Sequence, residues 1–188
     1  MWKPFETTVR LPEFEESIRF LASMRNPRVK VIRTRRNLLD VWISRQKHNS
    51  VKLSGNKIRG HCESGNDECI LRHLNTTRNM ELPTNQLLQW IDKTTKSEDT
   101  VDAMLDAYNV KHVHLSYENI FKNGANTRRK EIAMVLEFLR FDSNQTALAS
   151  LEELIGHAST ITPRESLVQY EEIKSVLFGT KYSDLLEY

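Results

Sequence analysis

The sequence predicts an α/β fold in which helices flank a parallel sheet. Two short runs, residues 29–32 and Val110 to Leu115, are rich in valine and isoleucine or alternate as buried strands do. Segments with apolar residues at helical spacing precede, separate and follow these runs. Strands that alternate with helices in this way belong to parallel sheets, so the two strands are expected to run parallel.

The chain is expected to form a single domain over residues 1–188. Its 188 residues are 39% apolar and 28% charged, a composition that suits one sizeable core and excludes a disordered tail. The 27 basic and 25 acidic residues leave a net charge of +2, so nucleic-acid binding is not expected. No stretch approaches the roughly 20 apolar residues that span a bilayer, and the sequence as given predicts a soluble chain.

Helix, strand and helix are predicted in that order at the start of the chain. Pro12 is followed by glutamates and by apolar residues at helical spacing, which predicts a helix that ends before Pro27. After the first strand, a second helix is indicated by four residues at helical spacing: Leu38, Val41, Trp42 and Arg45. Residues 47–83 show little periodicity and are predicted to form a long loop or insertion.

Further helices surround the second strand. Two precede it, Asn85 to Lys96 and Glu98 to Tyr108, with Ser97 expected to cap the second of them. Arg128 to Phe141 carries an apolar stripe, and a shorter helix is expected over Ala147 to Ile155. The last helix is predicted from a capping box at its start and a glycine at its end: Thr162, Pro163, Glu165 and Gly179.

The long loop contains both cysteines. Cys62 and Cys69 could form a disulfide in an oxidising compartment, and the sequons at Asn75 and Asn144 would accept glycans there. Such short patterns also arise by chance, so cytoplasmic and secretory-lumen locations both stay open. A zinc site would draw on four residues of the loop: His61, Cys62, Cys69 and His73. Their spacing lacks a CxxC pair, and no metal is expected.

Arginines stand where the first strand gives way to the second helix. Arg35 and Arg36 lie at this junction, and Ser44 follows in the helix. A strand end that leads into a helix brings guanidinium groups and helix-terminal N–H groups to one point, which suits a bound phosphate. A solvated charged patch beside Asp40 would account for the same residues.

The segment RNLLDVWIS, Arg36 to Ser44, resembles the 3′-phosphate-binding element of sulfotransferases of the carbohydrate-type branch. In that family a serine follows the arginine at the same spacing. VHLSYENIF, Val113 to Phe121, is similar to the family's strand that ends in Tyr-Glu-Asp-Leu, and Arg128 to Asp142 is similar to the helix that follows it. Arg164 to Leu186 is similar to the closing helix of these enzymes. The resemblance covers roughly residues 14–186.

The resemblance implies a P-loop-NTPase-like fold and 3′-phosphoadenosine 5′-phosphosulfate (PAPS) as sulfuryl donor. Arg36 then resembles the guanidinium and Ser44 the hydroxyl that hold the 3′-phosphate, and Arg35 is a further cofactor-binding candidate. Tyr117 resembles the tyrosine of the adenine pocket, although a half-buried aromatic at a strand end is the alternative. Glu118 is expected to cap the turn that follows it.

Nothing ahead of Lys30 resembles the family's phosphate-cradling loop, and the first glycine of the chain is Gly55. We therefore expect an N-terminally incomplete sulfotransferase fold or a degenerate member of the family. His48 and His61 are the candidates for the base that the acceptor needs. The remaining pair of interest, His112 and His114, is interpreted as packing or surface residues.

Two functions follow, and whether the chain is an enzyme stays open between them. The first is transfer of a sulfuryl group from PAPS to a hydroxyl or amine, with a glycan or other small molecule as acceptor. The second is a noncatalytic remnant of a sulfotransferase that binds nucleotide or glycan. A kinase-like enzyme would need a phosphate loop and magnesium carboxylates that the sequence does not offer.

Overall fold

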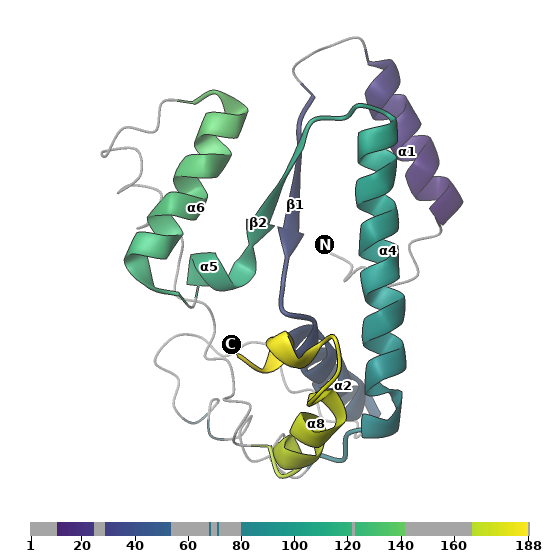
Figure 1. The fold of residues 1–188 in the computed structure, drawn as a ribbon, viewed down its shortest axis with the longest axis vertical. Helices are drawn as coiled ribbons and strands as arrows, with labels where there is room; N and C mark the ends of the chain where they lie inside the picture. Colours follow the sequence, from purple (N-terminus) through teal and green to yellow (C-terminus); the bar gives the residue numbers. More distant parts are fainter. Residues whose placement is uncertain are drawn as a thin grey trace.

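A two-stranded parallel sheet lies between helices in this computed structural model (Figure 1). β1 (Val31–Arg35) pairs with β2 (His112–Ser116), with Val31 opposite His112 in the register. The predicted parallel pairing is therefore confirmed, within a mixed α/β fold that is mostly helical. The structure describes residues 11–24, 29–53, 68, 71, 80–121, 123–141 and 167–187.

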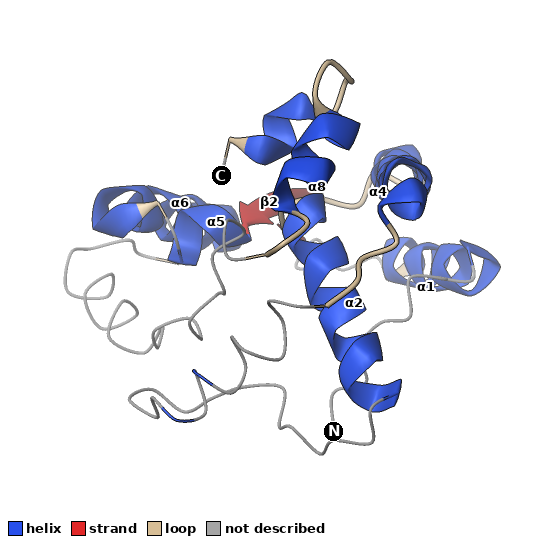
Figure 2. Ribbon diagram, turned by 90° about the horizontal axis from the view of Figure 1, so that it is seen from below, coloured by secondary structure: helices blue, strands red, loops and turns tan. Residues whose placement is uncertain are grey.

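Helices lie on both sides of the sheet and beyond one end of it. α6 (Gly124–Leu139) lies on one side, and α4 (Leu87–Ala107) and then α1 (Leu11–Ser23) lie on the other, an order that both ribbon views show (Figures 1 and 2). α2 (Leu38–Leu53) and α8 (Tyr170–Leu177) lie beyond the ends toward which the strands point. Shorter segments are η1 (Thr84–Gln86), α5 (Tyr117–Phe121) and η3 (Ser183–Leu186). None of the helices that the structure describes is both long and apolar enough to cross a bilayer.

Two apolar clusters hold these elements together, and α4 belongs to both. The larger cluster joins α2, α4 and α8, and its buried residues are Leu39, Trp42, Ile43, Leu82, Leu87, Ile91, Leu167, Ile173 and Leu177. The smaller joins α1, α4 and the start of the sheet, and its buried residues are Ile18, Val101, Leu105 and Val110. With 21 residues, α4 is roughly 31 Å long, enough to connect the sheet with the helices beyond its end.

α4 is one continuous helix, so the prediction of two helices with a cap at Ser97 was wrong. The segment contains neither glycine nor proline. The hydroxyls of Thr94 and Thr100 donate to the carbonyl oxygens of Trp90 and Lys96, four residues earlier, at 2.8 and 2.7 Å. Side chains that could have ended the helix are therefore accommodated inside it, and burial in two cores outweighs the local capping preference of serine.

The predicted loop over residues 47–83 was wrong at its start, whereas residues 80–83 contain neither helix nor strand and agree with it. α2 continues through Leu53, because no glycine or proline interrupts the chain before Gly55. At the other end, Leu82 is only 4% exposed within the larger apolar cluster. Most of residues 54–79 lie outside the described part of the chain, and both cysteines and His61 with them.

The boundaries of α6 and α8 agree only in part with those predicted from the sequence. Gly179 follows α8 with a φ of 73°, and the N–H of Thr180 donates to the carbonyl oxygen of Leu177 at 3.1 Å, so the predicted glycine end is confirmed. α6 begins at Gly124, ahead of its predicted start at Arg128. The predicted capping box at residues 162–165 and the helix at 147–155 lie outside the described residues.

Candidate functional site

β1 and β2 end at the same edge of the sheet, and the residues that follow them face a common point. Arg36 and Asn37 follow β1 and precede α2, whereas Tyr117 and Glu118 open α5 directly after β2. In open α/β sheets, ligands bind outside the carboxyl ends of the parallel strands. We call these four residues the strand-end site.

The guanidinium of Arg36 lies over the ring of Tyr117. Its carbon is 4.5 Å from the ring centroid, which is a cation–π distance. Phe121 packs on the same tyrosine, with the ring centroids 4.6 Å apart. The Nε atom of Arg36 is buried and has no hydrogen-bond partner among the described residues. The Nε of Arg35 is buried without a partner in the same way, so this feature alone does not distinguish Arg36. Because phosphate oxygens are strong acceptors for a guanidinium that has no carboxylate partner among the described contacts, the position of Arg36 favours an anion.

Asn37 and Glu118 fix the two strand ends to each other. The backbone N–H of Asn37 donates to Oε1 of Glu118 at 2.9 Å, and both residues are buried. Glu118 was predicted to cap its own turn, and this was wrong: it crosses to the other strand end. The turn after β2 is capped instead by Ser116, whose hydroxyl accepts the N–H of Asn119 at 3.2 Å.

The side chain of Asn37 caps the start of α2. Its Oδ1 accepts the N–H of Leu39 at 3.0 Å and the N–H of Asp40 at 3.4 Å, and its Nδ2 donates to the carbonyl oxygen of Leu185 at 3.1 Å. The helix-terminal N–H groups expected to help hold a phosphate therefore already have this acceptor. Arg36 remains as the donor that the strand-end site offers to an anion.

No described contact joins the other predicted site residues to this pair. Ser44 is exposed on α2, roughly 9 Å along the helix axis from Leu38. His48 lies further along the same helix, and its side chain and His61 fall outside the described part. Among the described contacts, Arg36 and Tyr117 are brought together and none joins Ser44 to them.

Arg35 points toward α4. Arg33 and Arg35, two residues apart on one face of the strand, both form ion pairs with Asp102 of α4. His114 of β2 joins them, with its Nε2 3.1 Å from Oδ1 of Asp102. We call Arg33, Arg35, Asp102 and His114 the α4-facing cluster. Burial lowers the pKa of His114, and the two guanidinium groups lower it further, which favours a neutral ring.

Sequence reasoning missed Asp102, although a signal for it exists. Glu98, Asp102 and Asp106 recur every four residues and so share one face of α4. Arg33 and Arg35 show the matching alternation on β1. Burial raises the pKa of Glu98 against the pull of both arginines, because the carboxyl group lies between the helix and the sheet.

The strand-end site thus supplies a positioned cation beside two aromatic rings. This arrangement suits binding of a phosphorylated aromatic molecule. We compared the chain with protein-family models, with curated proteins and with solved structures, and none of the three comparisons gave a match. The functional argument therefore rests on the site's geometry and on the sequence.

Proposed function

We propose that the chain is a sulfotransferase that binds PAPS at the strand-end site and transfers its sulfuryl group to a hydroxyl or amine, with a carbohydrate as acceptor. The observation that carries the proposal is the guanidinium of Arg36, which lies over Tyr117 where both strands end and has no carboxylate partner among the described residues. Phosphate oxygens are strong acceptors for such a group. The residues present at the strand ends therefore fit the 3′-phosphate of the donor.

Each residue has a distinct part in this proposal. Arg36 donates to the 3′-phosphate, and Ser44, on the helix that begins beside Arg36, supplies a hydroxyl. Tyr117 and Phe121 offer aromatic surface to the adenine. Transfer forms a bond from the acceptor atom to sulfur, breaks the bond from sulfur to the 5′-phosphate oxygen, and passes the acceptor's proton to a base. His48 and His61 stay the predicted bases.

The second candidate is a module that binds the nucleotide without transferring a sulfuryl group. It is favoured by the described residues of the strand-end site, which offer contacts to a phosphate and an aromatic base, because such contacts serve binding without transfer. Both candidates share the 3′-phosphate site, and only turnover separates them.

Calorimetric titration with adenosine 3′,5′-bisphosphate, against adenosine 5′-monophosphate, tests the shared site. We expect the bisphosphate to bind more tightly, and Arg36→Ala to weaken its binding by about 2 kcal/mol, roughly 30-fold, because a charge-assisted contact is lost. Arg19→Ala is the matched control, since Arg19 also lies over a tyrosine, 5.8 Å from the Tyr108 centroid, but on α1. Equal affinity for both nucleotides, or for Arg36→Ala and Arg19→Ala, would overturn the proposal.

A transfer assay then separates the two candidates. The chain is incubated with PAPS carrying labelled sulfur and with a panel of glycans, and label on the acceptor is measured. Transfer that is lost in Arg36→Ala supports the sulfotransferase. Binding of the bisphosphate with no transfer to any acceptor supports the noncatalytic module, whereas a preference for adenosine triphosphate over the bisphosphate contradicts both.

A further inference from the structure

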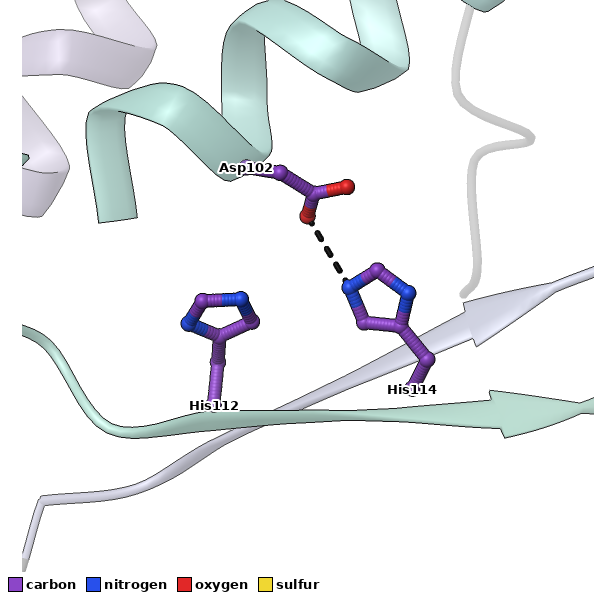
Figure 3. A group of neighbouring side chains, drawn as sticks. All are labelled: Asp102, His112 and His114. Atoms are coloured by element: carbon purple, nitrogen blue, oxygen red, sulfur yellow. Dashed lines mark hydrogen bonds and ion pairs between the residues drawn. The ribbon is translucent and has the colours of Figure 1, made fainter. Parts of the chain in front are cut away.

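Two histidines and an aspartate meet between α4 and the sheet. His112 and His114 alternate on β2, and both rings project from the strand toward α4, where Asp102 points back at them (Figure 3). The ring centroids are 5.6 Å apart. One nitrogen of each histidine and one oxygen of Asp102 all lie within 4.8 Å of one another. Three such atoms from two elements have the composition and convergence of a metal site.

We propose that Asp102, His112 and His114 bind one Zn²⁺ ion. Three protein ligands of these types, with a fourth position left for water, are the pattern of open zinc sites. Zinc takes nitrogen and oxygen ligands at about 2.0–2.2 Å, so two ligands of a tetrahedral ion lie roughly 3.3 Å apart. Nε2 of His114 and Oδ1 of Asp102 already meet this spacing at 3.1 Å. The His112 ring lies within 4.8 Å of both atoms, and it would have to turn, giving up the 3.1 Å contact between its Nδ1 and the carbonyl oxygen of Val110, to complete the site.

The arginines of the α4-facing cluster compete with the ion, because both donate to Asp102. Asp102 has two oxygens, however, and Arg35 pairs with Oδ2, which the ion does not need. Arg33 pairs with Oδ1, but it also donates to the carbonyl oxygen of Glu98 at 3.2 Å. Arg33 therefore keeps a hydrogen-bond acceptor when Oδ1 turns to zinc, although it gives up the carboxylate, and Arg35 keeps its ion pair with Oδ2.

Charge and access also suit a cation. α4 presents further carboxylates near the ligands: Glu98 and Asp99 act on Arg33, and Oδ1 of Asp106 lies 3.9 Å from Nδ1 of His112. Together with Asp102 they outnumber the two guanidinium groups. His112 also lines a cavity of about 300 Å³, with Asp106, Lys111 and Phe138 among its walls. Of the three proposed ligands, His112 alone lines this cavity, so an ion would enter past His112.

The proposal is tested by titrating the full chain with Zn²⁺ against a chromogenic chelator, and with Co²⁺ as a spectroscopic probe. We expect one ion per chain. His112→Asn and His114→Asn should each weaken Zn²⁺ binding by at least about 100-fold, because even the loss of a residue that only hydrogen-bonds to a metal ligand weakens binding by up to about that factor. His157→Asn and the double variant Cys62→Ser, Cys69→Ser are the controls and should bind as the original chain does. The cobalt spectrum should lack a thiolate charge-transfer band.

Competition by Arg33 gives a second, independent readout. Arg33→Gln should tighten Zn²⁺ binding by at least about tenfold, because the rival charge-assisted bond to Oδ1 is gone. A chain that binds no Zn²⁺, binding that survives in folded His112→Asn and His114→Asn, loss in the cysteine variant, or weaker binding in Arg33→Gln would each overturn the proposal. No nucleotide is present in these titrations, so their outcome is separate from that at the strand-end site.

Discussion

The strand-end site and the α4-facing cluster use their arginines in opposite ways, although these lie in β1 or directly after it. Arg36 lies on an aromatic ring, and its buried Nε has no acceptor among the described residues. Arg33 forms an ion pair with the carboxylate of Asp102, and only 15% of the Arg33 side chain is exposed. A guanidinium paired with a carboxylate contributes to the fold, whereas one held by a ring keeps its N–H groups for a ligand. Stability and binding should therefore depend on different arginines.

Asp102→Ala should have the largest effect on stability. The variant leaves Arg33 half-buried without its carboxylate, and we expect the free energy of unfolding to fall by about 3 kcal/mol, the low end for a broken buried pair. Urea denaturation at neutral pH, with a metal chelator present so that zinc plays no part, measures the change. Asp99→Ala, an exposed carboxylate on the same helix, is the control and should cost less than about 0.5 kcal/mol. Equal costs would show that the cluster does not stabilise the fold.

Asn37→Ala should come next, with a loss of about 2 kcal/mol. The change removes the cap of α2 and leaves the carbonyl oxygen of Leu185 without this donor. Asn123→Ala is the matched control, because Asn123 also precedes a helix, α6, but makes no side-chain cap bond there. Denaturation curves of the two variants should separate clearly. If they coincide, the strand ends are held by packing alone.

Arg36→Ala should change the free energy of unfolding by about 1 kcal/mol, between the values for exposed and desolvated cation–π contacts, because Arg36 is half-buried. The same variant is expected to lose most of its nucleotide affinity. Denaturation and calorimetry on one preparation measure both quantities. A stability loss as large as that of Asp102→Ala would place Arg36 among the structural arginines and remove the contrast between the two regions.

The sequence predicts the strand-end site better than the α4-facing cluster for a physical reason. The parallel pairing follows from the alternation of strands and helices, and parallel strands end at one edge, so Arg36 and Tyr117 had to come close. Asp102 and Arg33 are 69 residues apart in the sequence, and no pattern in either segment predicts that the two side chains form an ion pair. The continuous α4 was missed because the capping preference of Ser97 is local, whereas burial in two cores is not.

A third charged group, more exposed to solvent than Asp102, lies near the other end of α4. There Asp92 accepts hydrogen bonds from Lys96, Lys181 and Tyr182. These bonds lower the pKa of Asp92 well below its ordinary value of 3.8. A carboxyl group whose pKa is lower in the folded state adds stability above its ordinary pKa, and this stability is lost as the pH falls through the lowered value.

Asp92→Asn should therefore be less stable than the original chain at neutral pH, by the smallest margin of the series because water screens these charges. The difference between the two urea midpoints should narrow as the pH falls below about 4, and it should also narrow in high salt. A gap that stays constant from neutral to acid pH would mean that the hydrogen bonds, and not the charge of Asp92, supply the stability. The interactions of Asp92 would then stabilise the fold by a different mechanism from the half-buried ion pairs of Asp102, and not merely by a smaller amount.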